Sequence, residues 1–208
     1  MDPDGDAAGL AALRRLAGQD PGEHLPRLAA ALRTEAMGRA EAGDRAGALL
    51  AGVEAAAAYA GIVHPSVVHD VALAGLLEAM AHWFAEDGLD EAAAATAGDA
   101  VAVYFGLDEA EPGRHGPALA RALSFHSSAL WRVGEKEDAL DAAMESVDVL
   151  CDTDASGHAV AKALRDHARL ARELGRESDG ETFRRGVLDR LIGDPDRREA
   201  VERAWRDA

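Results

Sequence analysis

Four basic side chains in the last quarter of the chain could bind an anionic group. They are Lys162, Arg165, Arg169 and Arg172. Their spacings of three and four residues place them on one face of a helix. Arg offers a planar fork of N–H donors that matches a carboxylate, so this stripe would hold an acidic peptide or a protein C-terminus. Because Arg169 and Glu173 also form an ordinary i,i+4 pair, the stripe could equally be a solvated helix face.

The remaining residues do not form a pattern that is typical of a nucleophile or of a catalytic metal site. The eight histidines are scattered, and no pair has the i,i+4 spacing with a neighbouring Glu that is typical of a helical zinc site. The single cysteine, Cys151, has Asp148, Asp152 and Asp154 nearby, which would raise the pKa of its thiol. We therefore expect no enzyme activity, no catalytic residue, no metal site and no cofactor.

The elements that must position the basic stripe are predicted to be helices. The chain has 208 residues, 48% of them apolar but only 4% aromatic, and the apolar part is largely Ala, Leu and Val. Ala is the best helix former, and helices approach closely over it. No stretch alternates strictly between apolar and polar residues in the manner of a strand. The composition predicts one all-α domain.

The charge is strongly negative and unevenly distributed. The formal net charge is −16, and the interval between Arg45 and Arg114 holds eleven acidic residues and no Lys or Arg. Such a chain repels duplex nucleic acid and anionic membranes. No basic segment followed by an apolar run opens the chain, and the apolar run at 46–63 contains Glu54 and many small residues. We expect a soluble, cytoplasmic, acidic protein.

A glycine followed five residues later by a small residue recurs along the chain. The pairs are Gly43 and Ala48, Gly88 and Ala93, Gly134 and Ala139, and Gly175 and Gly180. A helical pattern precedes and follows each glycine, which is the preferred residue where a helix ends in a left-handed turn. The small residue allows the second helix to cross the first closely. The spacing therefore predicts an array of helical hairpins.

These units resemble the tetratricopeptide repeat (TPR) in a form common in high-GC bacteria. An apolar and then a small residue precede the glycine in each: Leu32 and Ala36, Leu77 and Ala81, Leu123 and Ser127, and Leu164 and Ala168. The resemblance covers about residues 24–193. It departs from the family in its period of 41 to 46 residues, in lacking the late Pro, and in having Gly52 at a bulky position.

The resemblance implies a right-handed solenoid of about four antiparallel hairpins within one domain, 1–208. An N-terminal helix and linker occupy 1–22, the hairpins 24–193, and a capping helix 194–208. First helices are predicted near 24–42, 65–86, 115–133 and 157–173. Second helices are predicted near 44–61, 89–105, 135–151 and 177–192, with a linker at 106–116. The initial helix is predicted at 6–17, and Ser66, Ser156 and Asp194 are candidate N-caps.

In this family the first helices line a concave groove, and the alignment of the repeats predicts which residues face it. Besides the basic stripe, we predict Arg121, Arg132 and His82 in the groove, with Trp131 beside it as a candidate anchor for a ligand side chain. Ser124 and Ser128 fall at groove positions of the third hairpin. His126 and His167 share one position in the third and fourth hairpins, which indicates packing between repeats.

Three hypotheses of function remain open at this stage. The first is a non-catalytic adaptor or scaffold that holds a partner protein or peptide in the groove, through an acidic or carboxylate group. The second is a self-assembling structural protein, such as a homodimer. The third is a small-molecule binder or enzyme with a pocket inside the superhelix, where His82, His126 and Trp131 would lie.

Overall fold

Glycine turns separate the helices of the chain where the spacing predicted them. At Gly134, φ is +91°, a left-handed conformation in which the Cβ of any other residue would crowd the backbone. The turns at 43, 88 and 175 have φ values of +82°, +73° and +70°. The four predicted helix ends are therefore confirmed.

The computed structural model describes the backbone of residues 3–206 and the side chains of residues 8–203 and 205. Within these residues all regular structure is helical. The elements are α1 (Pro3–Gln19), α2 (Pro21–Glu41), α3 (Arg45–Ala60), α4 (Val67–Glu86), α5 (Asp90–Ala110), α6 (Gly116–Val133), α7 (Lys136–Cys151), α8 (Gly157–Glu173), α9 (Glu177–Arg190), the 3-10 turn η1 (Leu191–Gly193) and α10 (Pro195–Arg206).

Most predicted helix boundaries agree with these bounds to within two or three residues, and two predictions need correction. The linker predicted over 106–116 begins too early, because α5 continues through Gly106 to Ala110. Leu107 is only 2% exposed, so its burial outweighs the weak helix propensity of Gly106. The linker predicted between the initial helix (6–17) and residue 22 is also too long, because α1 continues to Gln19 and Asp20 alone separates it from α2.

Side-chain caps explain where several helices begin. The Asp44 carboxylate accepts a hydrogen bond from the Gly47 amide at 2.9 Å, and the Ser156 hydroxyl accepts one from Ala159 at 3.3 Å. Asp194 accepts from the Arg197 amide at 3.0 Å, at the start of α10. Each cap satisfies a backbone N–H that has no partner within its helix. The predicted capping roles of Ser156 and Asp194 are confirmed.

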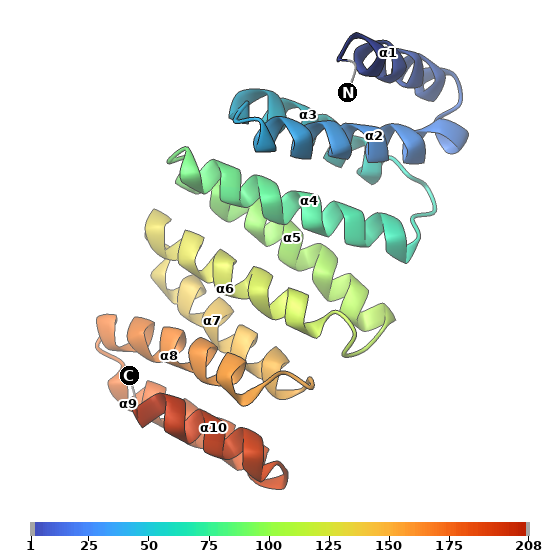
Figure 1. The fold of residues 1–208 in the computed structure, drawn as a ribbon. Coiled ribbons are helices and arrows are strands. Elements are labelled where there is room, and N and C mark those ends of the chain that lie inside the picture. The colour runs from blue at the N-terminus through green and yellow to red at the C-terminus, as the bar shows by residue number, and fades with distance from the viewer. Residues whose placement is uncertain (1–2, 207–208) are drawn as a thin grey trace. The chain divides into compact units, whose positions relative to one another are not determined.

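The chain divides into two compact units, Met1–Leu89 and Asp90–Ala208, so the second predicted hairpin is split at its glycine turn. In the first unit α2 pairs with α3, while α1 packs on α2 and α4 packs on α3 (Figure 1). Leu32, Ala48 and Leu76 lie in its core. Gly52 departs from the repeat pattern for a physical reason: a Cβ there would lie 2.8 Å from Met80 Sδ, so Met80 fills the space.

The second unit contains α5 to α10. Here α6 packs against both α5 and α7, α8 packs against α7 and α9, and α10 covers α8 (Figure 1). Val147, Val160, Leu164 and Val187 form its core. Gly157 allows α10 to approach the start of α8 closely, because a Cβ at this position would lie 2.7 Å from the Arg197 carbonyl oxygen.

Candidate functional site

The second unit contains a cavity of about 250 Å³ between α6 and α8. Helix α6 contributes three hydroxyl side chains, α7 contributes the methyl group of one alanine, and α8 contributes charged and apolar side chains. The lining residues are Ser124, Ser127, Ser128, Ala143, Lys162, Ala163, Asp166, Arg169 and Leu170. Spacings of three and four residues on α8 bring its members onto one helix face. The cavity therefore lies between the first helices of two consecutive predicted hairpins.

The α8 wall carries two cations, each paired with a carboxylate on its own helix. Lys162 Nζ lies 3.3 Å from Asp166 Oδ2, and Arg169 Nη1 lies 2.9 Å from Glu173 Oε1. All four side chains are substantially exposed, so each pair contributes roughly 0–1 kcal/mol to stability. Lys has three donors and Arg has five, so both can bind a further acceptor without leaving their carboxylates.

The α6 wall is fixed by hydrogen bonds to the backbone and to α7. The Ser127 hydroxyl donates to the Ala139 carbonyl at 2.7 Å, and the Ser128 hydroxyl donates to the Ser124 carbonyl at 3.1 Å. The oxygens of Ser124 and Ser146 lie 2.9 Å apart, and Ser146 donates to the Ala120 carbonyl at 2.8 Å. Ser127 and Ser146 are both buried, so these bonds are shielded from water.

The cavity brings together some of the residues predicted for the groove. Lys162 and Arg169 line it, together with the groove positions Ser124 and Ser128. Among the residues that the structure describes, its lining does not include Arg121, Trp131, Arg132, Arg165 or Arg172. His82 is exposed on α4 of the first unit.

Two of these other residues have clear local partners. Arg132 Nη2 lies 2.6 Å from Asp90 Oδ1 at the start of α5. Trp131 is half-buried against a cluster that includes Leu140 and Leu170, and Lys136 Nζ lies 5.1 Å from the centre of its ring. This is a packing position with a cation–π contact.

Sequence reasoning missed the contributions of Asp166 and Ser127 to the cavity. Asp166 lies one helical turn from Lys162, and the groove predicted from the sequence did not include it. Ser127 fits the small position of its repeat, and that pattern carries no information about its hydroxyl. The signal that could have found the wall was the run of hydroxyls at positions 124, 127 and 128, which share one helix face.

The two related histidines pack against different helices. His126 Nε2 lies 3.3 Å from the position of a Cβ at Gly98 on α5. The ring of His167 lies 4.5 Å from that of Phe183 on α9, and its Nδ1 is buried with no hydrogen-bond partner. Burial lowers the pKa of both histidines. Both occupy packing positions, as predicted, although their partners differ.

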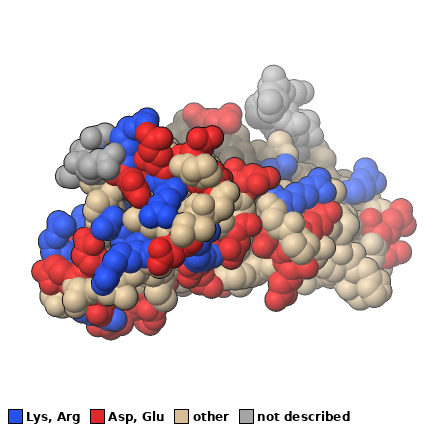
Figure 2. Space-filling view, turned by 90° about the horizontal axis from the view of Figure 1, so that it is seen from below, with Lys and Arg blue, Asp and Glu red and all other residues tan. Residues whose placement is uncertain are grey.

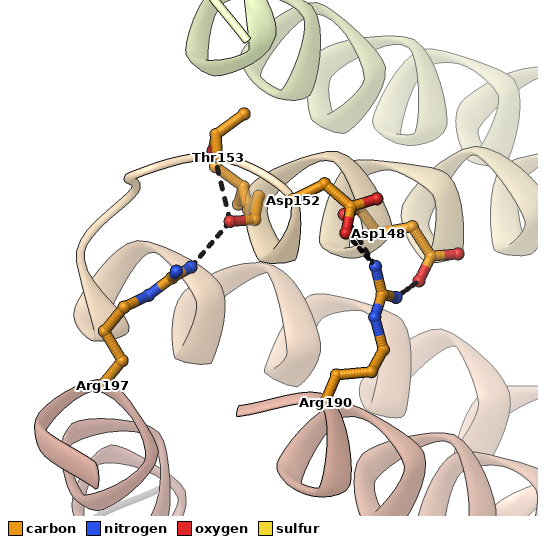
Figure 3. Close-up of polar contacts among 6 residues, drawn as sticks. Asp148, Asp152, Thr153, Arg190 and Arg197 are labelled. Atoms are coloured by element: carbon orange, nitrogen blue, oxygen red, sulfur yellow. Dashed lines mark hydrogen bonds and ion pairs between the residues drawn. The ribbon is translucent and has the colours of Figure 1, made fainter. Parts of the chain in front are cut away.

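Arginines from α9 and α10 hold the C-terminal end of α7, as Figure 3 shows. Arg190 binds both Asp148 and Asp152, the latter at 2.7 Å. Arg197 donates to the Leu150 carbonyl at 2.8 Å. These cations satisfy carbonyl and carboxylate oxygens at a helix C-terminus, where positive charge is favourable. The arrangement joins three helices of the second unit.

The charged residues at this end of α7 also affect the pKa of the Cys151 thiol. Burial raises its pKa, and Asp148 and Asp152 raise it further. Arg190 and Arg197 act in the opposite direction. The sequence predicted the direction correctly from the aspartates alone, but burial is the larger cause. A thiol with a raised pKa is a poor nucleophile.

The surface around the C-terminal helices alternates in charge. The end of the second unit that holds α9 and α10 shows Lys and Arg interleaved with Asp and Glu (Figure 2). Arg184 pairs with Glu181 at 3.1 Å, and Arg203 pairs with Glu199 at 2.6 Å. This face is a mosaic of short-range ion pairs with little net charge.

The described part of the chain holds neither a metal-binding cluster nor a membrane-spanning helix. Among those residues, no group of three or more His, Cys, Asp and Glu side chains is placed to hold a metal ion. None of the described helices combines the length and the apolar character needed to cross a membrane.

Comparisons with known proteins give matches in structure alone. No family model matches the chain, and no curated protein matches it in sequence. BtubC (BKLC) from P. vanneervenii is similar in structure, with a TM-score of 0.56 and 19% identity over 98% of this chain and 88% of that one.

TPR-like repeats of kinesin light chain type from Podosopora anserina are also similar. They have a TM-score of 0.58 and 14% identity over 90% of this chain and 88% of that one. A point variant of the same repeats gives a TM-score of 0.59 and 14% identity over 90% and 87% of the two chains. In its fold, the chain is a tetratricopeptide-repeat-like helical repeat protein.

Proposed function

We propose that this chain is a non-catalytic interaction module that binds a peptide segment of a partner protein between α6 and α8. The observation that carries the proposal is the cavity itself, because it brings Lys162 and Arg169 opposite the hydroxyls of Ser124 and Ser128. The two cations face an acceptor of the partner, of which a carboxylate is the simplest form. The TPR-like fold supports this class, since such folds are typical of interaction and scaffold proteins.

The rest of the proposal concerns the context of binding. The module acts in the cytoplasm as one domain over 1–208, and its partner is a protein rather than nucleic acid or a membrane. The excess of negative charge supports this choice, because it opposes binding to polyanions. The raised pKa of Cys151 favours a non-catalytic role.

The test compares two variants with the same change in charge. Lys162→Glu/Arg169→Glu reverses the cavity cations and removes two i,i+4 pairs. Arg198→Glu/Arg203→Glu removes two such pairs on α10 and serves as the matched control. Each tagged protein, with its helicity checked by circular dichroism, is used to capture partners from a lysate of the source cell. The captured protein is identified by mass spectrometry, and its binding peptide is measured by calorimetry.

The proposal expects the wild type and the control to retain the same partner, and the cavity variant to bind its peptide at least tenfold more weakly. Equal affinity for all three proteins would show that the cavity is not the binding surface.

A second candidate function is self-association through α3 of the first unit. Leu50 and Val53 are 76% and 56% exposed on one face of this helix, which also exposes Ala57. Exposed apolar side chains on one helix face are typical of an interface. Sedimentation equilibrium over a hundredfold range of concentration tests this alternative. A dimer that Leu50→Glu/Val53→Glu dissociates would support it, and a monomer at every concentration would exclude it.

A further inference from the structure

The hydroxyl hydrogens on the α6 wall are all committed to bonds within the protein. Each serine hydroxyl has one hydrogen to donate and two lone pairs. Ser127 donates to the Ala139 carbonyl, and Ser128 donates to the Ser124 carbonyl. Ser146 donates to the Ala120 carbonyl, so in the pair between Ser124 and Ser146 the hydrogen comes from Ser124. The oxygens of Ser124, Ser127 and Ser128 therefore present only lone pairs to the cavity.

The α8 wall has the opposite polarity over part of its surface. Lys162 and Arg169 have donors beyond those bound to Asp166 and Glu173. A group that fills the cavity must therefore accept hydrogen bonds on the α8 side and donate them on the α6 side. Asp166 lies on the α8 wall as well, so a negatively charged occupant would lie near a like charge.

A carboxylate meets only half of these requirements. It has acceptors for Lys162 and Arg169, but it has no hydrogen for the serine oxygens and is repelled by Asp166. A side-chain carboxamide has both groups: its carbonyl oxygen accepts from one of the two α8 cations, which lie seven residues or about 10 Å apart along the helix, and its NH₂ donates twice toward the α6 hydroxyls. It is neutral, so both ion pairs on α8 stay intact. Since a water takes about 30 Å³ in the liquid, a cavity of about 250 Å³ has room for the amide and its methylenes.

We propose that this cavity recognises a side-chain carboxamide, an Asn or Gln of a partner peptide, with its carbonyl on Lys162 or Arg169 and its NH₂ on Ser124 and Ser128. This inference rests on the proposed peptide-binding function and specifies the group that the cavity selects.

The test uses two small probes that differ in one group. N-acetyl-glutamine methylamide and N-acetyl-glutamate methylamide are titrated into ¹⁵N-labelled full-length protein at pH 7 and constant ionic strength. Backbone amide shifts of Ser128 and Ala163 report on the two walls. We expect saturable shifts with the glutamine probe and an affinity at least threefold weaker for the glutamate probe. Equal affinities, a preference for glutamate, or no saturable shift would each overturn the inference.

Two variants at one exposed position sharpen the test without disturbing the core. Ser128→Ala removes an acceptor, and the loss of one hydrogen bond predicts an affinity for the glutamine probe about 2- to 10-fold weaker. Ser128→Lys replaces the acceptor with donors and should reverse the preference toward the glutamate probe. Thr34→Ala on α2 is the matched control, because the Thr34 hydroxyl also donates to the carbonyl four residues earlier, at 3.0 Å. An unchanged preference in Ser128→Lys would contradict the inference.

The two proposals can fail separately. A captured partner that requires Lys162 and Arg169 supports the interaction module even where the glutamate probe binds better than the glutamine probe. In that case a carboxylate is the group recognised, and the carboxamide inference alone is wrong.

Discussion

The two units build the same kind of helical layers but present different chemistry on their predicted first helices. In the first unit, the exposed side chains of α2 and α4 include Met37, Val68 and Val71, which are 36%, 74% and 40% exposed. In the second unit, α6 and α8 instead present hydroxyls and charged groups around a cavity. One scaffold therefore exposes individual apolar side chains on these helices in one unit and carries a polar site in the other.

The interiors differ in the same direction. Among the described residues, the buried polar side chains are Ser127, Ser146 and His167, and all three belong to the second unit. Two of them hold the α6 wall through hydrogen bonds to the Ala139 and Ala120 carbonyls. Buried polar groups of this kind favour one geometry because any other leaves them unsatisfied. The buried polar side chains therefore fix the geometry of the cavity wall in the second unit.

The largest effects should come from shortening an equivalent leucine in each of the two cores, because each substitution leaves a space that the core does not refill. Leu32 and Leu164 occupy the same repeat position, and both are 0% exposed. Leu32→Ala and Leu164→Ala should each cost about 2–5 kcal/mol of stability. Hydrogen exchange should show the loss of protection first in α1–α4 for Leu32→Ala and first in α5–α10 for Leu164→Ala. The exposed Leu50→Ala is the control, with an expected change within about 0.5 kcal/mol. Identical exchange patterns for both core variants would contradict the division into two units.

Glycine substitutions should distinguish rigid from adaptable packing. Gly157→Ala places a methyl group 2.7 Å from the Arg197 carbonyl oxygen, so it should cost about 1–3 kcal/mol. Gly52→Ala meets the flexible Met80 side chain at 2.8 Å and should cost less. Gly186→Ala on α9 meets nothing within 4 Å and should stabilise the protein by about 0.5–1 kcal/mol. Urea denaturation measures all three, and an equal cost at 52 and 157 would contradict this difference in packing.

Acid should weaken the second unit through its two packed histidines. Burial is the main reason why the pKa values of His126 and His167 are lowered. The charges acting on them are Glu135 and Asp138 for His126, and Arg176 and Asp148 for His167. Of these four charges, Arg176 alone lowers a pKa further, and the three carboxylates act in the opposite direction. Because the folded-state pKa lies below that of the unfolded chain, the unfolded chain binds more protons at acidic pH. Stability is therefore complete above about pH 6.5 and falls as the pH decreases below it.

The measurement is the urea midpoint between pH 7.5 and pH 5. His167→Leu keeps an apolar side chain against Phe183 and should reduce the loss of stability on acidification. His158→Leu, at an exposed position of α8, is the control and should retain the dependence of the wild type. If His167→Leu follows the wild type at every pH, burial of this ring does not control the acid response.

The sequence predicted the helical layers well because glycine and alanine act locally. A positive φ at a position such as Gly134 is a property of one residue, so spacing alone located the turns. The end of α5 was missed because it depends on the burial of Leu107, which is a tertiary property. The division at the Gly88 turn was not predicted either, since it follows from contacts over the whole chain.

The cavity was predictable only in part, for the same reason. Helical spacing placed Lys162 and Arg169 on one face, and the repeat register placed Ser124 and Ser128 in the groove. The bond between Ser124 and Ser146 joins residues 22 positions apart, so it requires the packing of α6 on α7. The polarity of the α6 wall depends on the direction of these hydrogen bonds. Their direction follows from the packing of the helices and cannot be deduced from spacing along the sequence.

The smallest expected effects concern ion pairs that join helices distant in sequence in each unit. Arg190 on α9 binds Asp148 on α7, with side chains 39% and 42% exposed. Arg14 on α1 binds Glu54 on α3 at 2.6 Å, with side chains 46% and 40% exposed. At such exposure each pair should contribute about 0.2–1 kcal/mol, measured by double-mutant cycles with Arg190→Gln/Asp148→Asn and Arg14→Gln/Glu54→Gln. Because Arg190 also binds Asp152, Arg190→Gln should be the more destabilising of the two Arg→Gln variants. Both coupling energies should shrink in 1 M salt, and a coupling that salt leaves unchanged would show that packing of the alkyl chains holds these helices together.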